Sequence, residues 1–256
     1  MKILAINGSH RGTNGFTSFL INKIATGAIE AGADFEIIEL SKLKINRCIA
    51  CSKCQTAEHY KQCVFDGKDD ALEVITKIEN ADVLILASPI YVFNISALLK
   101  TLLERYYSKG ASDKLELTRS GLMFHDVSEK LKGKKFLGLL VSNNMENATT
   151  EASEVFFRNF ARFMDLDYIG TIKRSSGKLV GYGKELEKEV KFPRIIEVYN
   201  ELESIGRQLA ITGRVRKSSI RKASRLIIPV PFLRQLMKFP FFKRKMVKVA
   251  AEKYVA

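Results

Sequence analysis

Short runs of consecutive apolar residues alternate with longer segments in which apolar residues recur every three or four positions. Runs of the first kind are typical of strands buried on both faces of a parallel sheet, and segments of the second kind are typical of amphipathic helices. The apolar runs predict strands over residues 3–6, 35–40, 83–87, 136–141 and 168–172. The periodic segments predict helices from Thr17 onward and over residues 69–78, 96–107, 151–164 and 185–211, with a break or kink at Pro193.

Five predicted strands that alternate with helices indicate an α/β fold with a doubly wound, five-stranded parallel sheet. Segment 110–133 has no clear period and is polar for its length, so we expect an irregular excursion over the surface. Residues 1–212 contain all the predicted strands and form the predicted domain. Residues 213–256 form a basic, amphipathic C-terminal extension with helical character.

Polar loops follow three of the predicted strands, over residues 8–18, 88–94 and 142–147. In doubly wound sheets, ligands bind at the carboxyl ends of the strands, near the point where the strand order reverses. One ligand that contacts all three loops is therefore the simplest hypothesis.

The first loop leads from a buried strand into a helix N-terminus and is rich in hydroxyl groups. Unpaired N–H groups and the positive end of the helix dipole attract phosphate at such a place. The loop lacks both GxxxxGK[ST] and GxGxxG, which argues against nucleotide hydrolysis and against the usual dinucleotide fingerprint. It suits a phosphate monoester that stays bound, and an ordinary turn rich in glycine and serine is the alternative.

Four cysteines, the only ones in the chain, lie in one window as Cys48-x2-Cys51-x2-Cys54 followed, after eight residues, by Cys63. Closely spaced thiolates can bind successive corners of a cubic iron–sulfur cluster, and a more distant fourth thiolate completes the set. Zinc usually takes two separated CxxC pairs, so the spacing favours a [4Fe–4S] cluster. His59 inside the window is a further candidate ligand, but a solvent-exposed loop histidine is the favoured interpretation. Free structural cysteines or a disulfide are the alternatives.

Three motifs together resemble the flavodoxin-like NAD(P)H-dependent FMN reductase superfamily: Gly8-Ser9-x-Arg11 with Thr17, Ser88-Pro89-Ile90-Tyr91, and Ser96-Ala97-x-x-Lys100 before Arg105. The resemblance covers roughly the first two thirds of the chain, and the cysteine window is most similar to that of the iron–sulfur flavoproteins. Two departures stand out. The chain has Gly15-Phe16-Thr17 where the family often has Gly-Asn-Thr, and the gap before Cys63 is longer than usual.

The resemblance implies that FMN lies across the strand ends. Its phosphate would contact Ser9, Arg11, Thr17 and Ser18, with Asn14 in place of the missing family asparagine. Its ring would be flanked by Pro89, Ile90, Tyr91, Phe93 and Asn94, and the loop with Ser142 and Asn143 would complete the ring pocket. NAD(P)H would stack transiently on the flavin, and dimers or tetramers are typical of the family.

The formal net charge of +14 at pH 7 is concentrated at the C-terminus. Residues 213–256 contain 13 Lys and Arg residues and one acid, whereas residues 1–212 contain 29 basic and 27 acidic residues. Apolar residues are interleaved with these cations: Leu226, Ile227, Ile228, Phe232, Leu233, Leu236, Met237, Phe239, Phe241 and Phe242. The extension suits contact with anionic lipid, docking of an acidic redox protein such as a ferredoxin, or a solvated basic face on packed helices. No recognition motif for nucleic acid accompanies the charge.

These patterns predict an FMN-dependent oxidoreductase whose flavin exchanges single electrons with a [4Fe–4S] cluster and serves a small-molecule or protein redox partner. One alternative is a cluster-free NAD(P)H-dependent FMN or quinone reductase, and another is a non-catalytic redox sensor or membrane-surface binding module. No nucleophile–base pair is evident, so no catalytic side chain is assigned. The sequence has neither a transmembrane-length apolar run nor a signal peptide, which predicts a cytoplasmic protein with peripheral membrane contact as an option.

Overall fold

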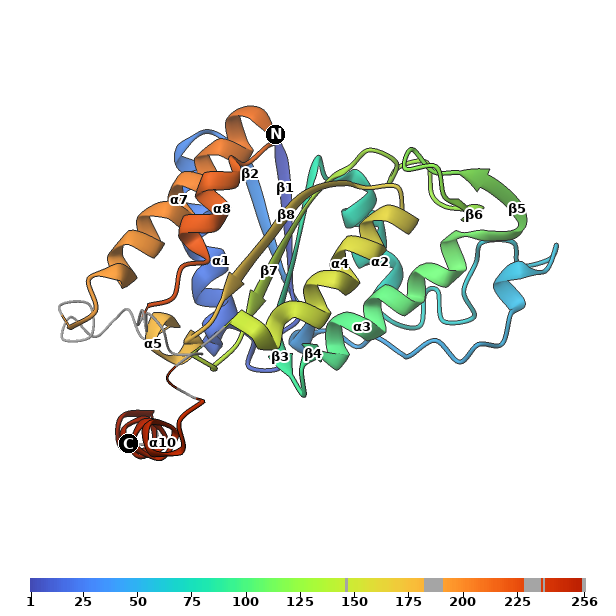
Figure 1. The fold of residues 1–256 in the computed structure, drawn as a ribbon. Coiled ribbons are helices and arrows are strands. Elements are labelled where there is room, and N and C mark those ends of the chain that lie inside the picture. The colour runs from blue at the N-terminus through green and yellow to red at the C-terminus, as the bar shows by residue number, and fades with distance from the viewer. Residues whose placement is uncertain (146, 182–190, 228–235, 237, 255–256) are drawn as a thin grey trace.

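The computed structural model describes residues 1–145, 147–181, 191–227, 236 and 238–254 (Figure 1). Its centre is a parallel sheet with the strand order β2-β1-β3-β7-β8. The strands are β1 (Lys2–Asn7), β2 (Asp34–Glu39), β3 (Val83–Tyr91), β7 (Lys135–Val141) and β8 (Asp167–Arg174). All five predicted strands are present, and the doubly wound α/β fold is confirmed.

Helices cover both faces of this sheet (Figure 1). One layer contains α1 (Phe16–Glu30), α5 (Gly177–Gly181), α7 (Arg194–Thr212) and α8 (Lys217–Ala223). The other contains α2 (Ala71–Asn80), α3 (Ala97–Glu104) and α4 (Glu151–Phe163). A 3₁₀ helix, Arg105–Lys109, continues α3, and α7 begins directly after Pro193. The first part of the predicted helix 185–211 lies outside the described residues.

Alternating side chains of the central strands fill two separate apolar cores. Ile3 and Ala5 of β1 belong to the core on the side of α1 and α7. Leu4 and Ile6 belong to the core on the side of α2 and α3. Burial on both faces explains why these strands are continuous apolar runs in the sequence.

Two predictions about the connections were wrong. The expected loop after residue 87 is partly strand, because β3 continues to Tyr91 and pairs antiparallel with β4 (Asn94–Ile95). The expected irregular excursion contains a two-stranded sheet of β5 (Ala111–Leu117) and β6 (Met123–Asp126). Most β5 side chains are exposed, so this hairpin has no buried face that would impose an apolar pattern on the sequence.

The start of the C-terminal extension packs on the domain. Ala223 of α8 and the following Ile227 are buried in the same core as α7. The buried Arg174 guanidinium at the end of β8 donates to Ala223 O over 2.6 Å and also to Arg225 O. Burial lowers the pKa of Arg174 to about 10. These bonds attach the extension to β8, the outer strand of the sheet.

The last helix, α10 (Pro240–Tyr254), lies apart from the sheet and its covering helices (Figure 1). Among the described helices, none is both long enough and apolar enough to cross a membrane. Some of the apolar residues singled out in the extension lie outside the described residues: Ile228, Phe232, Leu233 and Met237.

Two glycines allow α1 and α7 to cross in close contact. A Cβ on Gly27 would collide with the carbonyl oxygen of Glu203, and a Cβ on Gly206 would collide with that of Ile24. The crossing therefore has no room for any side chain larger than hydrogen at these positions. This contact fixes the layer that carries the N-terminus of α1, where the first predicted ligand loop ends.

We predict that Gly27→Ala lowers the free energy of unfolding by about 1–3 kcal/mol, because the added methyl group must push the two helices apart. The expected loss of stability is opposite to the effect of helix propensity, which favours alanine over glycine by about 1 kcal/mol. Urea denaturation measures the effect. Asn22→Ala, at an exposed position of the same helix, is the control and should change stability by about 0.5 kcal/mol or less. Equal stability of the two variants would contradict the close crossing.

Candidate functional site

The three predicted ligand loops lie along one edge of the sheet, formed by the carboxyl ends of its strands, because β1, β3 and β7 are parallel neighbours. The Gly8 N–H donates to Ala87 O over 2.8 Å, so the first loop is attached to β3 where it leaves β1. The ring centroids of His10 and Tyr91 lie 5.8 Å apart and bring the first and second loops together. The first and second loops are therefore close enough to contact a single ligand, and the third loop follows the neighbouring strand β7.

Ser9 organises the turn that leads into α1. Its N–H donates to Asn7 Oδ1 over 3.0 Å, and its Oγ accepts the Arg11 N–H over 3.2 Å. A Cβ on Gly15, the N-cap of α1, would lie 2.6 Å from Ser9 Oγ, so the turn favours glycine there. Glycine offers no side-chain cap to the first N–H groups of the helix, and an anion could accept their hydrogen bonds.

Ser18 and Asn7 bind a carboxylate beside this turn. Ser18 Oγ donates to Glu39 Oε1 over 3.1 Å, and Asn7 Nδ2 donates to Glu39 Oε2 over 2.7 Å. The hydroxyl hydrogen of Ser18 is therefore directed at Glu39. The Ser18 hydroxyl therefore already donates its hydrogen, whereas the Ser9 hydroxyl only accepts a hydrogen bond, and Ser18 has its backbone N–H left for an anion.

The other predicted phosphate contacts differ in exposure. Thr17 is buried, whereas Arg11 and Asn14 are exposed. The Arg11 guanidinium carbon lies 5.4 Å from the ring centroid of Phe16, in cation–π geometry. This contact holds a cation beside the turn without removing it from water.

The second loop is a tight hairpin with a strained tip. Tyr91 pairs with Asn94, and the two residues between them, Val92 and Phe93, have φ values of 47° and 64°. A two-residue turn with positive φ at both positions favours asparagine and glycine, and a β-branched residue there is an outlier. Such strain persists where the surroundings hold it, and it is concentrated at ligand sites.

A cavity of about 380 Å³ lies beside this hairpin, within the usual size range of ligand pockets. Its lining combines flat or apolar side chains with a few polar groups, and it consists of His10, Tyr91, Asn94, Ile95, Ala97, Lys100 and Phe156. A flat and largely apolar ring suits this lining.

The third loop and its neighbours contain buried polar atoms without partners. Among the described residues, four of these atoms lie near the ends of β7 and β8: Ser142 Oγ, Asn147 Oδ1, Thr149 Oγ1 and Ser175 Oγ. Buried polar groups are rarely left unsatisfied, so this group indicates a polar ligand edge or bound water. Asn143 differs, because its Oδ1 accepts the Lys178 N–H over 3.1 Å. Sequence patterns indicated Ser142 but not Ser175 or Thr149, which belong to no motif.

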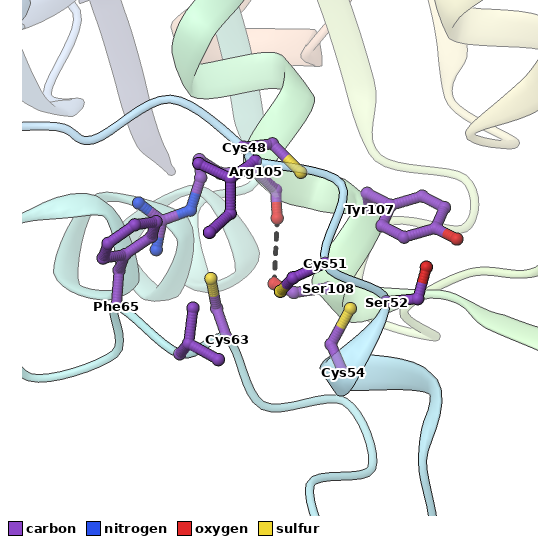
Figure 2. Close-up of a pocket in the computed structure, with 11 residues that line it drawn as sticks. Cys48, Cys51, Ser52, Cys54, Cys63, Phe65, Arg105, Tyr107 and Ser108 are labelled. Atoms are coloured by element: carbon purple, nitrogen blue, oxygen red, sulfur yellow. Dashed lines mark hydrogen bonds between the residues drawn. The ribbon is translucent and has the colours of Figure 1, made fainter.

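The four cysteines line one small pocket outside the central sheet (Figure 2). All four are free thiols. Burial raises the pKa of the Cys54 thiol against a hydrogen bond from Gln55, and the nearby Cys63 and Cys51 add to the rise. His59, the further candidate ligand, does not line this pocket, and its Nε2 lies 3.8 Å from the neighbouring Glu58 carboxylate.

The described thiols are not arranged for tetrahedral zinc. Of the described ligand atoms, no three cysteine sulfurs lie within 4.8 Å of one another. Tetrahedral zinc with bonds of about 2.3 Å would bring its sulfur ligands to about 3.8 Å from each other. A four-iron cluster binds each thiolate to a different iron and therefore needs wider spacing.

The backbone of the cysteine loop takes left-handed conformations at non-glycine residues. Ala50 and Ser52, on either side of Cys51, have φ values of 50° and 56°, and Lys61 has a φ of 58°. Gln55 holds the loop by donating to Tyr107 O over 3.2 Å and to Gly110 O over 3.1 Å. The loop is thus a defined structure whose turns orient successive cysteines.

A buried ion pair attaches this loop to the end of α3. Arg105 Nη1 lies 2.5 Å from Asp69 Oδ2, and both side chains are buried. Arg105 Nη1 also donates to Asn46 O over 3.0 Å, while Asp69 Oδ2 accepts the Asn46 N–H over 2.9 Å. The guanidinium lies over the Phe65 ring at 5.3 Å and borders the pocket beside Cys63 (Figure 2).

Both members of this pair are charged at neutral pH. Burial alone would raise the pKa of Asp69, but Arg105 and the backbone N–H groups of Asn46 and Ala71 hold it below its ordinary value. Burial opposes the charge of Arg105, but Asp69 and Cys63 raise its pKa. The pair thus places a fixed cation beside the cysteine pocket.

Helix α3 joins the two sites. Ser96 caps its N-terminus at the edge of the three loops, where Ser96 Oγ accepts the Leu99 N–H over 3.2 Å, and Arg105 follows its C-terminus. A rise of about 1.5 Å per residue gives this helix a length of roughly 12 Å. A groove of about 660 Å³ shares Lys100 and Phe156 with the hairpin cavity and Cys48 with the cysteine pocket. The groove therefore connects the two sites along α3.

Comparison with known families and proteins agrees with this geometry. The model of the NADPH-dependent FMN reductase family matches residues 1–164. An iron–sulfur flavoprotein of Methanocaldococcus jannaschii is 36% identical over 105 residues, which are 41% of this chain and 51% of the relative. An iron–sulfur flavoprotein of Archaeoglobus fulgidus is 35% identical over 105 residues, 41% of this chain and 48% of the relative. The chain thus spans about half the length of the curated relatives it matches.

Solved structures show the same fold at low identity. An FMN-dependent NADH-azoreductase from Bacillus anthracis, solved with FMN, has a TM-score of 0.56 at 16% identity and covers 82% of this chain and 100% of its own. An NAD(P)H:quinone oxidoreductase from Methanothermobacter marburgensis has a TM-score of 0.54 at 14% identity and covers 82% and 98%. At these identities the likeness establishes the fold.

We predict that Arg105→Leu lowers the free energy of unfolding by about 3–5 kcal/mol, because it leaves the buried Asp69 carboxylate without its counter-ion. Thermal or urea unfolding measures the loss. Adding Asp69→Asn to the Arg105→Leu protein should recover part of it, since the neutral amide removes the uncompensated charge. A single variant as stable as the parent protein would show that the pair does not hold the cysteine loop.

Proposed function

Since the chain belongs to the NADPH-dependent FMN reductase family, we propose that it is an FMN-dependent oxidoreductase that moves electrons from NAD(P)H to a small-molecule or protein acceptor. We propose further that its four cysteines hold a [4Fe–4S] cluster that exchanges single electrons with the flavin. The observation that carries the proposal is the meeting of the three loops after β1, β3 and β7 at one edge of the sheet.

The first loop supports the phosphate end of FMN. Ser9 and the uncapped start of α1 offer N–H and hydroxyl donors, and the Arg11 cation lies beside them. Thr17 lies in the first turn of α1, where its backbone N–H is among the unpaired donors. A dianionic phosphate matches this donor set better than a neutral ligand does.

The second and third loops support the flavin ring. Tyr91 and Asn94 line the cavity beside the hairpin, and the strained turn at Val92 and Phe93 connects these two residues. The unpartnered Ser142 Oγ on the third loop offers a hydrogen bond to a polar ring edge. Pro89 and Ile90 precede the hairpin on β3 and would pack near the ring.

The cysteine pocket supports the cluster. Four thiols line one small pocket, and the Arg105 cation lines it beside Cys63. The relatives similar to this chain carry the name iron–sulfur flavoprotein, which agrees with the same donor set. FMN can accept a two-electron hydride and release single electrons, so it suits a place between NAD(P)H and a cluster.

Partners follow from the same proposal. The nicotinamide would stack transiently on the flavin ring. The acceptor would be a small molecule or a redox protein such as a ferredoxin. Members of the family are often oligomeric, and we expect a homo-oligomer here. We propose a cytoplasmic protein, and no side chain of the chain is assigned a proton-transfer role.

A cluster-free NAD(P)H-dependent FMN or quinone reductase is the second candidate. The groove of about 660 Å³ next to the hairpin cavity favours it, because aromatic residues such as Phe156 and Phe160 would accept an apolar ring. Anaerobic purification separates the two candidates: iron and sulfide together with flavin support the cluster, whereas flavin alone with NAD(P)H oxidation supports the second candidate. A protein that binds no flavin would be a sensor or a binding module.

We predict that Ser9→Ala combined with Arg11→Ala weakens FMN binding by about tenfold or more, because both changes remove groups directed at the phosphate. Fluorescence titration of the flavin-free protein measures the dissociation constant. Riboflavin, which lacks the phosphate, should bind the variant and the parent protein equally well. Ser218→Ala with Arg221→Ala, at exposed positions of α8, is the matched control and should not change FMN affinity. Unaltered FMN affinity in the first variant would exclude this phosphate site.

We predict that Cys51→Ser removes most of the iron and sulfide but leaves FMN bound, because Cys51 lies in the cysteine pocket and not at the three loops. Iron and sulfide content per flavin, measured after anaerobic purification, test the assignment. Gln62→Ala, an exposed residue next to Cys63, is the control and should keep the metal content. Unchanged iron in the Cys51→Ser protein would reject the ligand assignment while leaving the flavin proposal intact.

A further inference from the structure

The final helix presents phenylalanines to solvent next to cations. Phe239, Phe241 and Phe242 are 60%, 72% and 40% exposed, and Val247 further along α10 is 59% exposed. The rings of Phe241 and Phe242 contact each other edge to face at 5.8 Å. Large apolar side chains with this exposure are not packed against the rest of the described chain, so they are free for an external apolar phase.

Cations flank these phenylalanines along the chain. Five exposed basic residues flank or follow them: Lys238, Lys243, Arg244, Lys245 and Lys248. Within the described part of the chain, none of these five has an ion-pair partner. Some basic residues of the domain do form ion pairs, as Lys23 bonds Glu203 at 3.3 Å and Lys77 bonds Glu36 at 2.9 Å. Residues 213–256 carry 13 basic residues and one acid, so the positive charge is concentrated in the extension, in contrast to the nearly neutral residues 1–212.

We propose that the segment from Lys238 through α10 binds the surface of a membrane that contains anionic phospholipid. The phenylalanines at the start of the helix enter the boundary between headgroups and acyl chains, and the neighbouring cations contact the headgroup phosphates. Each basic side chain near a negatively charged surface adds to the attraction, which decays within a Debye length. The proposal is independent of the flavin and of the cysteines.

Lipid fits these residues better than an acidic protein does. An acidic protein surface would match the cations but would leave Phe239, Phe241 and Phe242 in water. A bilayer interface matches both, because it offers an apolar layer a few ångströms below a layer of negative charge. Figure 1 shows α10 apart from the sheet, so a bilayer could reach it without displacing the helices that cover the domain.

Vesicle sedimentation of the full-length protein tests the proposal. The protein should sediment with vesicles of phosphatidylcholine and phosphatidylglycerol, remain in solution with phosphatidylcholine alone, and be released by added salt. The combined variant Lys243→Glu, Arg244→Glu, Lys245→Glu should bind the anionic vesicles at least about tenfold more weakly than the parent protein. The variant Phe241→Ala, Phe242→Ala should also bind about tenfold more weakly, although its charge is unchanged.

A matched control separates a local contact from the effect of net charge. The variant Lys42→Glu, Lys68→Glu, Lys130→Glu carries the same charge change at exposed positions of the domain and should sediment like the parent protein. Circular dichroism of each variant checks that the domain is folded. If the parent protein stays in solution with the anionic vesicles, or if the control variant loses as much binding as the helix variant, the proposal is wrong. Retained binding by the phenylalanine variant would overturn the insertion of these rings.

Discussion

Parallel pairing of β1 with β3, and of β3 with β7, is the constraint on which the proposed flavin site depends. It sends three strand ends to the same edge of the sheet, so residues as far apart in sequence as Ser9, Tyr91 and Ser142 become neighbours. Each strand is buried on both faces, and a slip in register would expose an apolar face. The apolar cores therefore fix the position of loops that themselves contain mostly polar residues.

The cysteine pocket lies outside this framework and needs its own anchor. Its loop contains no strand, and its short 3₁₀ turn cannot hold four thiols in place. The Arg105–Asp69 pair does this by joining the returning chain to the end of α3, which is itself packed on the sheet. Because both charges are buried, removing either one leaves the other buried without a counter-ion. The same cation that anchors the loop also lines the cysteine pocket beside Cys63.

The sequence predicted the parts of the molecule that repeat a simple physical pattern. The central strands could be recognised because burial on both faces excludes polar residues, and the cysteine window because few other contexts group four thiols. The β5–β6 hairpin could not, since its side chains are exposed and leave no period. Glu39 was also missed. Its hydrogen bonds to Asn7 and Ser18, which lie 32 and 21 positions earlier in the chain, depend on the pairing of β1 with β2. The resulting loss of the Ser18 hydroxyl as a donor could not be predicted from the loop alone.

The separation of the two sites has a consequence for how the chain works. The loops of the flavin site belong to the fold itself, because any doubly wound sheet creates such an edge. The cysteine pocket is an addition at the far end of α3, and its strained residues Ala50 and Ser52 serve no purpose in the sheet. The ion pair, the left-handed turns and the four thiols occur together around one small pocket. This combination supports our proposal of a metal centre over four cysteines placed there by packing alone.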